Sequence, residues 1–139
     1  MNQTSIFWPM IAHVVLVYIA YTVLGIRRIG AVRSGTVRVS QFKTRSTEPD
    51  TSATAANNIL NQFELPMLFH IVCLALFLTN GISYLTLMLA WLFILTRYAH
   101  AFVHLTSNRV PIRSNLFAAG LVIVGVMWAW LALNLLALV

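Results

Sequence analysis

Long apolar runs alternate with short polar segments along the chain. Four windows are apolar enough, and long enough, to be bilayer-spanning helices, which require about 20 residues each. They cover about residues 6–25, 55–78, 83–105 and 115–138, and the first half of the second window is partly polar. The pattern predicts an all-α integral membrane protein, a four-helix bundle that forms one domain over residues 1–139.

The connections between these windows differ in length and in charge. Residues 26–54 form a long loop with six of the nine basic residues, and a second loop at 106–114 carries Arg109 and Arg113. The turn at 79–82 is short, so the second and third helices are expected to form an antiparallel hairpin. Four crossings put both basic loops on one side. The positive-inside rule predicts that this side is cytoplasmic, as in a bacterial inner membrane, with both termini opposite.

Composition supports the membrane assignment and excludes other classes. Hydrophobic residues make up 60% of the chain and charged residues only 9%, whereas soluble domains carry about 25% charged residues. The net charge of +6 does not indicate a nucleic-acid partner, because basic loops beside a bilayer are attracted to its anionic lipids. Membrane lipids are therefore the expected partners.

Two polar stripes interrupt the second and third windows, each with residues spaced to share one helical face. The stripes are Asn57, Asn61 and Glu64 on the second helix, and Arg97, His100 and His104 on the third. If the hairpin turns between residues 80 and 81, residues at equal depth have numbers that sum to about 161. The three levels then pair Glu64 with Arg97, Asn61 with His100, and Asn57 with His104.

Ionisable groups inside a membrane are costly unless they are paired. The stripes therefore predict a buried Glu64–Arg97 ion pair with flanking amide–imidazole hydrogen bonds. Pro66 is predicted to kink the second helix close to this pair. Such a network either fixes the packing of the bundle or orients a ligand, and the spacing alone does not choose between them.

The histidines allow further interpretations. His100 and His104 are spaced to share a metal ion, but no additional histidine or second carboxylate lies at that depth, so no metal site is expected. His13 and His70 each stand alone on apolar helices and are interpreted as hydrogen-bonded packing residues. The arginines beside the helix ends either anchor lipid head groups or converge on an anion at the mouth of the polar cluster.

The polar segments resemble a known family. The run NQFELPMLF at 61–69 is similar to the second-helix signature of the MAPEG family, the membrane-associated proteins of eicosanoid and glutathione metabolism. RYAHAFVH at 97–104, followed by RVPIRS at 109–114, resembles a second signature of that family, with the bacterial-type branch the nearest. The resemblance covers essentially the whole chain. It implies a four-helix protomer that forms a homotrimer and binds glutathione, as a co-substrate, between subunits near the cytoplasmic face.

The resemblance also implies which residues bind glutathione. Asn61 and Glu64 match positions that contact it, and Arg27 matches a basic position that holds one of its carboxylates. Arg97 matches the arginine of the third-helix signature. His104 stands where characterised members have a tyrosine that lines the site.

Arg113 and His100 are the expected catalytic residues. Arg113 matches the arginine that stabilises the glutathione thiolate, and His100 would donate a proton in place of a tyrosine. A departure from the pattern is Asn57, which stands where glutathione enzymes of the family carry an arginine. The resemblance implies a glutathione transferase or peroxidase that acts on lipophilic electrophiles or hydroperoxides. The alternative is a non-enzymatic trimeric membrane protein whose polar core is structural and whose basic loops bind anionic lipid or a partner.

Overall fold

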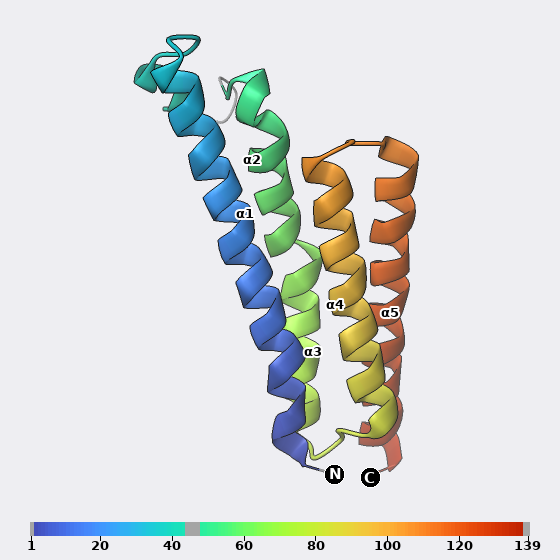
Figure 1. Ribbon diagram of the computed structural model, residues 1–139. Coiled ribbons are helices and arrows are strands. Elements are labelled where there is room, and N and C mark those ends of the chain that lie inside the picture. The colour runs from blue at the N-terminus through green and yellow to red at the C-terminus, as the bar shows by residue number, and fades with distance from the viewer. Residues whose placement is uncertain (1, 44–47, 138–139) are drawn as a thin grey trace.

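The chain forms a bundle of long helices that lie side by side (Figure 1). The structure is a computed structural model that describes residues 2–43 and 48–137. Four helical segments are long and apolar enough to cross a membrane, namely Gln3–Arg33, Asp50–Leu78, Tyr84–Leu105 and Val110–Leu136. The protein is therefore an all-helical, multi-pass membrane protein, as predicted.

The first span is longer than its apolar run. It begins as a short 3-10 helix, η1 (Gln3–Ile6), and continues as α1 (Phe7–Arg33), past the predicted end at residue 25. Its one proline, Pro9, lies in the first turn of α1, where a missing N–H is tolerated. The first glycine with a positive φ, at 71°, is Gly35, beyond the end of the helix. The 31 residues of this span extend about 46 Å at 1.5 Å each, against about 30 Å of hydrocarbon. Its last turns therefore lie outside the hydrocarbon, beside a second 3-10 helix, η2 (Val39–Phe42).

The second span is broken in the middle. It consists of α2 (Asp50–Phe63) and α3 (Leu65–Leu78), and Glu64 between them has non-helical angles of φ −81° and ψ −90°. Pro66 follows in the first turn of α3. Proline lacks an N–H and clashes with the carbonyl four residues earlier, so the helix cannot continue straight through this point. The predicted kink is confirmed.

The predicted hairpin between the second and third spans is also confirmed. Asn80 adopts a left-handed conformation with φ 54°. The N–H of Gly81 donates to Leu76 O at 2.8 Å and that of Asn80 to Phe77 O at 3.2 Å, which is the Schellman pattern of helix termination. Ser83 then caps α4 (Tyr84–Leu105), because its Oγ accepts from the Thr86 N–H at 3.2 Å.

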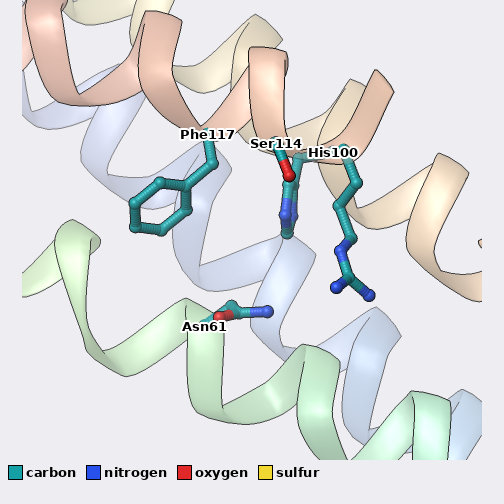
Figure 2. A pocket seen from close by; sticks show the side chains of 5 residues that line it. Asn61, His100, Ser114 and Phe117 are labelled. Atoms are coloured by element: carbon teal, nitrogen blue, oxygen red, sulfur yellow. The ribbon is translucent and has the colours of Figure 1, made fainter. Parts of the chain in front are cut away.

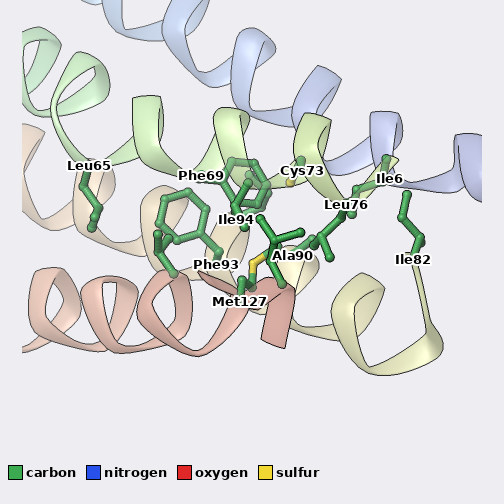
Figure 3. Close-up of a cluster of buried hydrophobic side chains, with 13 residues drawn as sticks. Ile6, Leu65, Phe69, Cys73, Leu76, Ile82, Ala90, Phe93, Ile94 and Met127 are labelled. Carbon is green, nitrogen blue, oxygen red and sulfur yellow. The ribbon is translucent and has the colours of Figure 1, made fainter. Parts of the chain in front are cut away.

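The last helix, α5 (Val110–Ala137), begins earlier than the predicted residue 115 and packs along α4. The apolar core lies toward the end of the bundle that holds both termini, where Phe69 and Phe93 stack with ring centroids 4.4 Å apart, close to Met127 (Figure 3). Both basic loops lie at the opposite end (Figure 1). Which end faces the cytoplasm stays a prediction.

Candidate functional site

The predicted Glu64–Arg97 ion pair is wrong. Glu64 lies at the helix break and is exposed on the surface of the bundle. Arg97 is only 1% exposed, and the only ion pair among the described residues joins Arg28 to Glu48. The reason lies in the orientation of α2. Its face with Asn57, Asn61 and Glu64 is exposed or half-buried, and the neighbouring face points inward.

That inward face carries Asn58 and Gln62, which belong to a continuous hydrogen-bonded chain of side chains. We call these five residues the polar chain: His70, His13, Gln62, Asn58 and His104. Successive members are 3.0, 3.2, 3.3 and 3.4 Å apart. His104 therefore pairs with Asn58, and the predicted pairing of His104 with Asn57 is wrong. His13 and His70, which seem isolated in the sequence, are hydrogen-bonded to each other.

Arg97 is a buried cation held against α5. Its Nη2 donates to Leu116 O at 3.1 Å, and its guanidinium carbon lies 5.4 Å from the ring centroid of Phe93 and 5.3 Å from that of Phe117. Gly120 makes this approach possible, because a Cβ there would be 2.6 Å from Nη2. The other donors, Nε and Nη1, are buried without a hydrogen-bond partner. The described contacts that compensate this charge are the hydrogen bond to Leu116 and the two cation–π contacts.

Directly beside Arg97 is a cavity of about 220 Å³ with walls from α2, α4 and α5 (Figure 2). Its lining residues are Asn61, His100, Arg113, Ser114 and Phe117. Three predicted site residues thus come together, one from each helix. The ring of Phe117 connects the cavity wall to Arg97. We call this space the cationic cavity.

The polar groups of the cationic cavity are only partly satisfied. His100 is 2% exposed, and its Nδ1 is buried without a hydrogen-bond partner. Arg113 donates from Nη1 to Asn108 Oδ1 at 2.8 Å, which ties it to the loop before α5. Ser114 and Phe117 are absent from the sequence prediction. Phe117 is four residues after Arg113 and three after Ser114, and this spacing could have indicated that Phe117 shares a helix face with each of them.

Two other predicted residues lie elsewhere, and one lies behind the cavity. Arg27 donates to Thr54 Oγ1 at 2.7 Å and to Leu105 O at 2.6 Å, and it lines a separate cavity beside α4. Glu64 does not line the cationic cavity either. His104 is adjacent to it, with a ring centroid 5.7 Å from that of His100.

Among the described residues, no carboxylate side chain lines the cationic cavity. The chain has three acidic residues, and none of them lines it. Glu48 instead accepts from Arg28 Nε at 3.0 Å and Nη2 at 2.5 Å, and from Ser52 Oγ at 2.5 Å. The hydrogen bonds from Arg28 hold the pKa of this carboxyl below its usual range. The cavity is therefore suited to an anion.

The fold and the cavity define a class: a four-span membrane protein with a polar, cationic site between its helices at the end that carries the basic loops. The MAPEG family model matches residues 5–133, and the chain belongs to the MAPEG family. Neither a curated protein nor a solved structure matches it.

Proposed function

We propose that this protein is a glutathione-dependent membrane enzyme, a transferase or peroxidase that acts on lipophilic electrophiles or hydroperoxides. The family includes enzymes with these activities. The observation that carries the proposal is the cationic cavity itself. Asn61, His100 and Arg113 meet there beside the buried, unneutralised charge of Arg97, an arrangement suited to an anionic ligand.

The residues present fit part of a glutathione molecule. Asn61 can both donate and accept hydrogen bonds, and Arg113 offers a cationic fork. The cavity of about 220 Å³ is smaller than the roughly 300–1,000 Å³ of typical small-molecule sites. One protomer would thus enclose only a portion of the tripeptide, and the proposed homotrimer would complete the site. Arg27 and Glu64 belong to the proposed site only as residues supplied to the cavity of a neighbouring protomer.

The proposed roles follow from the position of each side chain. A bound glutathione would supply a thiolate, which would form a bond to an electrophilic carbon as that carbon's leaving group departs or a neighbouring atom takes a proton. With a hydroperoxide, the thiolate would attack the O–O bond and release the alcohol, and a second glutathione would convert the resulting sulfenic acid to the disulfide and water. Thiols have an ordinary pKa of about 8.5, and a nearby cation favours the thiolate. Arg113 is proposed to hold that negative charge, with Arg97 adding to the positive potential from behind Phe117. His100, whose Nδ1 has no partner, is proposed to exchange a proton with the substrate.

The alternative function is a non-enzymatic membrane protein with a structural polar core. The commitment of Arg27 to Thr54 and Leu105 favours it, because that arginine is then not free to hold a carboxylate. In both cases the basic end is proposed to be cytoplasmic and to contact anionic lipid.

Glutathione binding to the purified protein distinguishes these two functions. We would measure affinity by equilibrium titration and the thiolate by its ultraviolet absorbance. The enzyme proposal predicts binding with a thiolate signal, and at least a tenfold weaker affinity for Arg113→Ala, about 1.4 kcal/mol. Arg109→Ala is the matched control, because Arg109 is exposed in the same loop region and does not line the cavity. No binding by the unmodified protein at millimolar glutathione would leave the non-enzymatic alternative.

A further inference from the structure

A second cavity lies on another face of α2, away from the cationic cavity. Its volume is about 240 Å³, and it is lined by His13, Gln62, Phe63, Met67 and His70. Asn61 and Gln62, one in each cavity, are consecutive residues and so point about 100° apart around the helix. The second cavity contains one end of the polar chain. We call it the histidine cavity.

The histidine cavity lies within the hydrocarbon layer. His13 is seven residues from Ile6, and His70 is eight residues from the end of α3 at Leu78. At about 1.5 Å per residue, His13 is about 10 Å along the helix from Ile6 and His70 is about 12 Å from Leu78. The first helix begins and α3 ends at the same end of the bundle, so His13 and His70 lie at about the same depth in the membrane. At this depth a polar group has no bulk water to bind, so its partners must come from the protein or a ligand.

The hydrogen bonds of the polar chain all have one direction. Amide nitrogens only donate, so Asn58 Nδ2 donates to His104 Nδ1 and Gln62 Nε2 donates to Asn58 Oδ1. Gln62 Oε1 only accepts, so it must receive a proton from His13 Nε2.

The direction of the chain also determines which nitrogen donates in the hydrogen bond between His13 and His70. A neutral His13 that carries its proton on Nε2 has a lone pair on Nδ1. It therefore accepts at Nδ1 from His70 Nε2–H, 3.0 Å away.

The direction of the chain determines what His70 offers to the cavity. With its proton on Nε2, a neutral His70 has a lone pair on Nδ1. The hydrogen bond of His70 to His13 uses Nε2, and no described residue donates to Nδ1. Because His70 lines the histidine cavity, the open end of the chain is a hydrogen-bond acceptor beside this space. A carbonyl or an ether cannot satisfy it, because neither has a proton to donate.

The cavity walls indicate the shape of the matching group. Phe63 and Met67 line it and are 51% and 59% exposed, so they form an apolar rim. An aromatic ring and a thioether favour contact with another aromatic ring. The volume is again below that of a complete small-molecule site, so the cavity would take a head group and leave a long tail in the bilayer.

We propose that the histidine cavity binds the phenolic head of a lipid-soluble molecule, with the hydroxyl donating to Nδ1 of His70. Gln62 and Asn58 act as positioning residues, because their amide orientations fix the proton of each imidazole. The site is separate from the cationic cavity, so it does not depend on whether the protein uses glutathione.

The test compares para-octylphenol with para-octylanisole, its methyl ether, on unmodified protein in lipid nanodiscs. Nitrogen NMR of histidine-labelled protein reports both binding and the position of each ring proton. We expect the phenol to bind saturably and to shift the Nδ1 resonance of His70, with the ether at least tenfold weaker. Equal affinity for the two compounds would overturn the proposal, as would a free His70 that carries its proton on Nδ1.

Variants give an independent check. His70→Phe removes the acceptor and should abolish the difference between the two compounds. Ile71→Ala is the matched control, because Ile71 is the next residue on α3 and is 45% exposed, yet it does not line the cavity. It should bind the phenol like the unmodified protein. If Ile71→Ala weakens binding as much as His70→Phe, the hydroxyl is not bound at His70. The comparison of phenol and ether needs no variant, so it stands even if His70→Phe does not fold.

Discussion

The bundle contains two buried polar regions that differ in how completely their hydrogen bonds are made. In the polar chain, four hydrogen bonds of 3.0–3.4 Å join the five side chains from His70 to His104. In the cationic cavity and its wall, Arg97 Nε, Arg97 Nη1 and His100 Nδ1 are buried without a partner. Both regions use α4, and His100 and His104 are one helical turn apart.

The difference indicates that the polar chain holds the helices together, whereas the cationic cavity has polar groups available to a ligand. A connected polar network in a low dielectric stabilises one arrangement of its helices. Buried donors without partners cost free energy, and in native proteins such groups require a specific explanation. A bound anion would supply partners to Arg113 and His100 and offset the charge of Arg97. The internal chain needs no anion, and its free groups are confined to its ends.

The largest expected effect is on the polar chain. Gln62→Leu leaves the Nε2–H of His13 and the Oδ1 of Asn58 without partners, and each buried orphan costs about 1–3 kcal/mol. Because interhelical hydrogen bonds in membranes are often weaker than in water-soluble cores, we expect a loss of about 2–4 kcal/mol in the free energy of unfolding. A reversible unfolding titration in mixed micelles measures it. Asn61→Leu is the control and should change stability by less than about 1 kcal/mol. Equal losses would remove the distinction between the two faces of α2.

The next effect concerns the fit of Arg97 against α5. Gly120→Ala places a Cβ 2.6 Å from Arg97 Nη2, so the guanidinium must move, and such overpacking costs about 1–3 kcal/mol. Gly125→Ala is the matched control on the same helix, because nothing lies within 4 Å of its added Cβ. It should be neutral or slightly stabilising, since alanine favours helices over glycine by about 1 kcal/mol. The same unfolding titration compares the two variants, and equal behaviour would mean that Arg97 adjusts freely.

Removal of the Arg97 charge should separate stability from binding. Arg97→Met keeps much of the apolar volume and removes donors that have no partner, and replacing buried charges by apolar groups is often neutral or stabilising. We expect an unfolding free energy equal to that of the unmodified protein or up to about 1 kcal/mol higher. Glutathione affinity should fall about tenfold, or about 1.4 kcal/mol. A large loss of stability with unchanged affinity would make Arg97 a structural residue.

Depth along the helices could be predicted from the sequence, whereas the inward face of α2 could not. Counting from the hairpin turn correctly placed Asn61 level with His100, and both line one cavity. The same count placed His104 one residue from its actual partner, Asn58. Asn57 and Asn61 are four apart, and so are Asn58 and Gln62. Helical spacing therefore gave no preference between the two faces.

The features of the site that could not be predicted depend on contacts between residues far apart in the sequence. His13 on α1 binds Gln62 and thereby helps to hold the inward face, but this partner is 49 residues away. Counting from the terminal end of each span would have placed His13 and His70 at similar depth. The position of Arg97 depends on a missing side chain at Gly120, on a helix whose approach the sequence does not specify. The length of the loop predicted at residues 26–54 was overestimated, because α1 continues as a helix beyond its apolar run.

The smallest expected effect concerns a third polar region, the Arg28–Glu48 ion pair, which is satisfied like the polar chain but lies outside the hydrocarbon. The Glu48 side chain is only 6% exposed, but Arg28 is 35% exposed, so water still competes for the pair. Surface ion pairs contribute about 0.2–1 kcal/mol. Glu48→Gln should therefore cost less than about 1 kcal/mol at pH 7.

Arg28 lowers the pKa of Glu48 in the folded protein. The contribution is thus complete above the ordinary carboxyl pKa of about 4.3 and is lost as the pH falls through the lowered value. Unfolding titrations of both proteins at several pH values should show a difference that vanishes in acid. Asp50→Asn, an exposed acid in the first turn of α2, controls for the loss of one negative charge. A difference that stays constant down to low pH would mean that Glu48 acts through packing and that its charge contributes nothing.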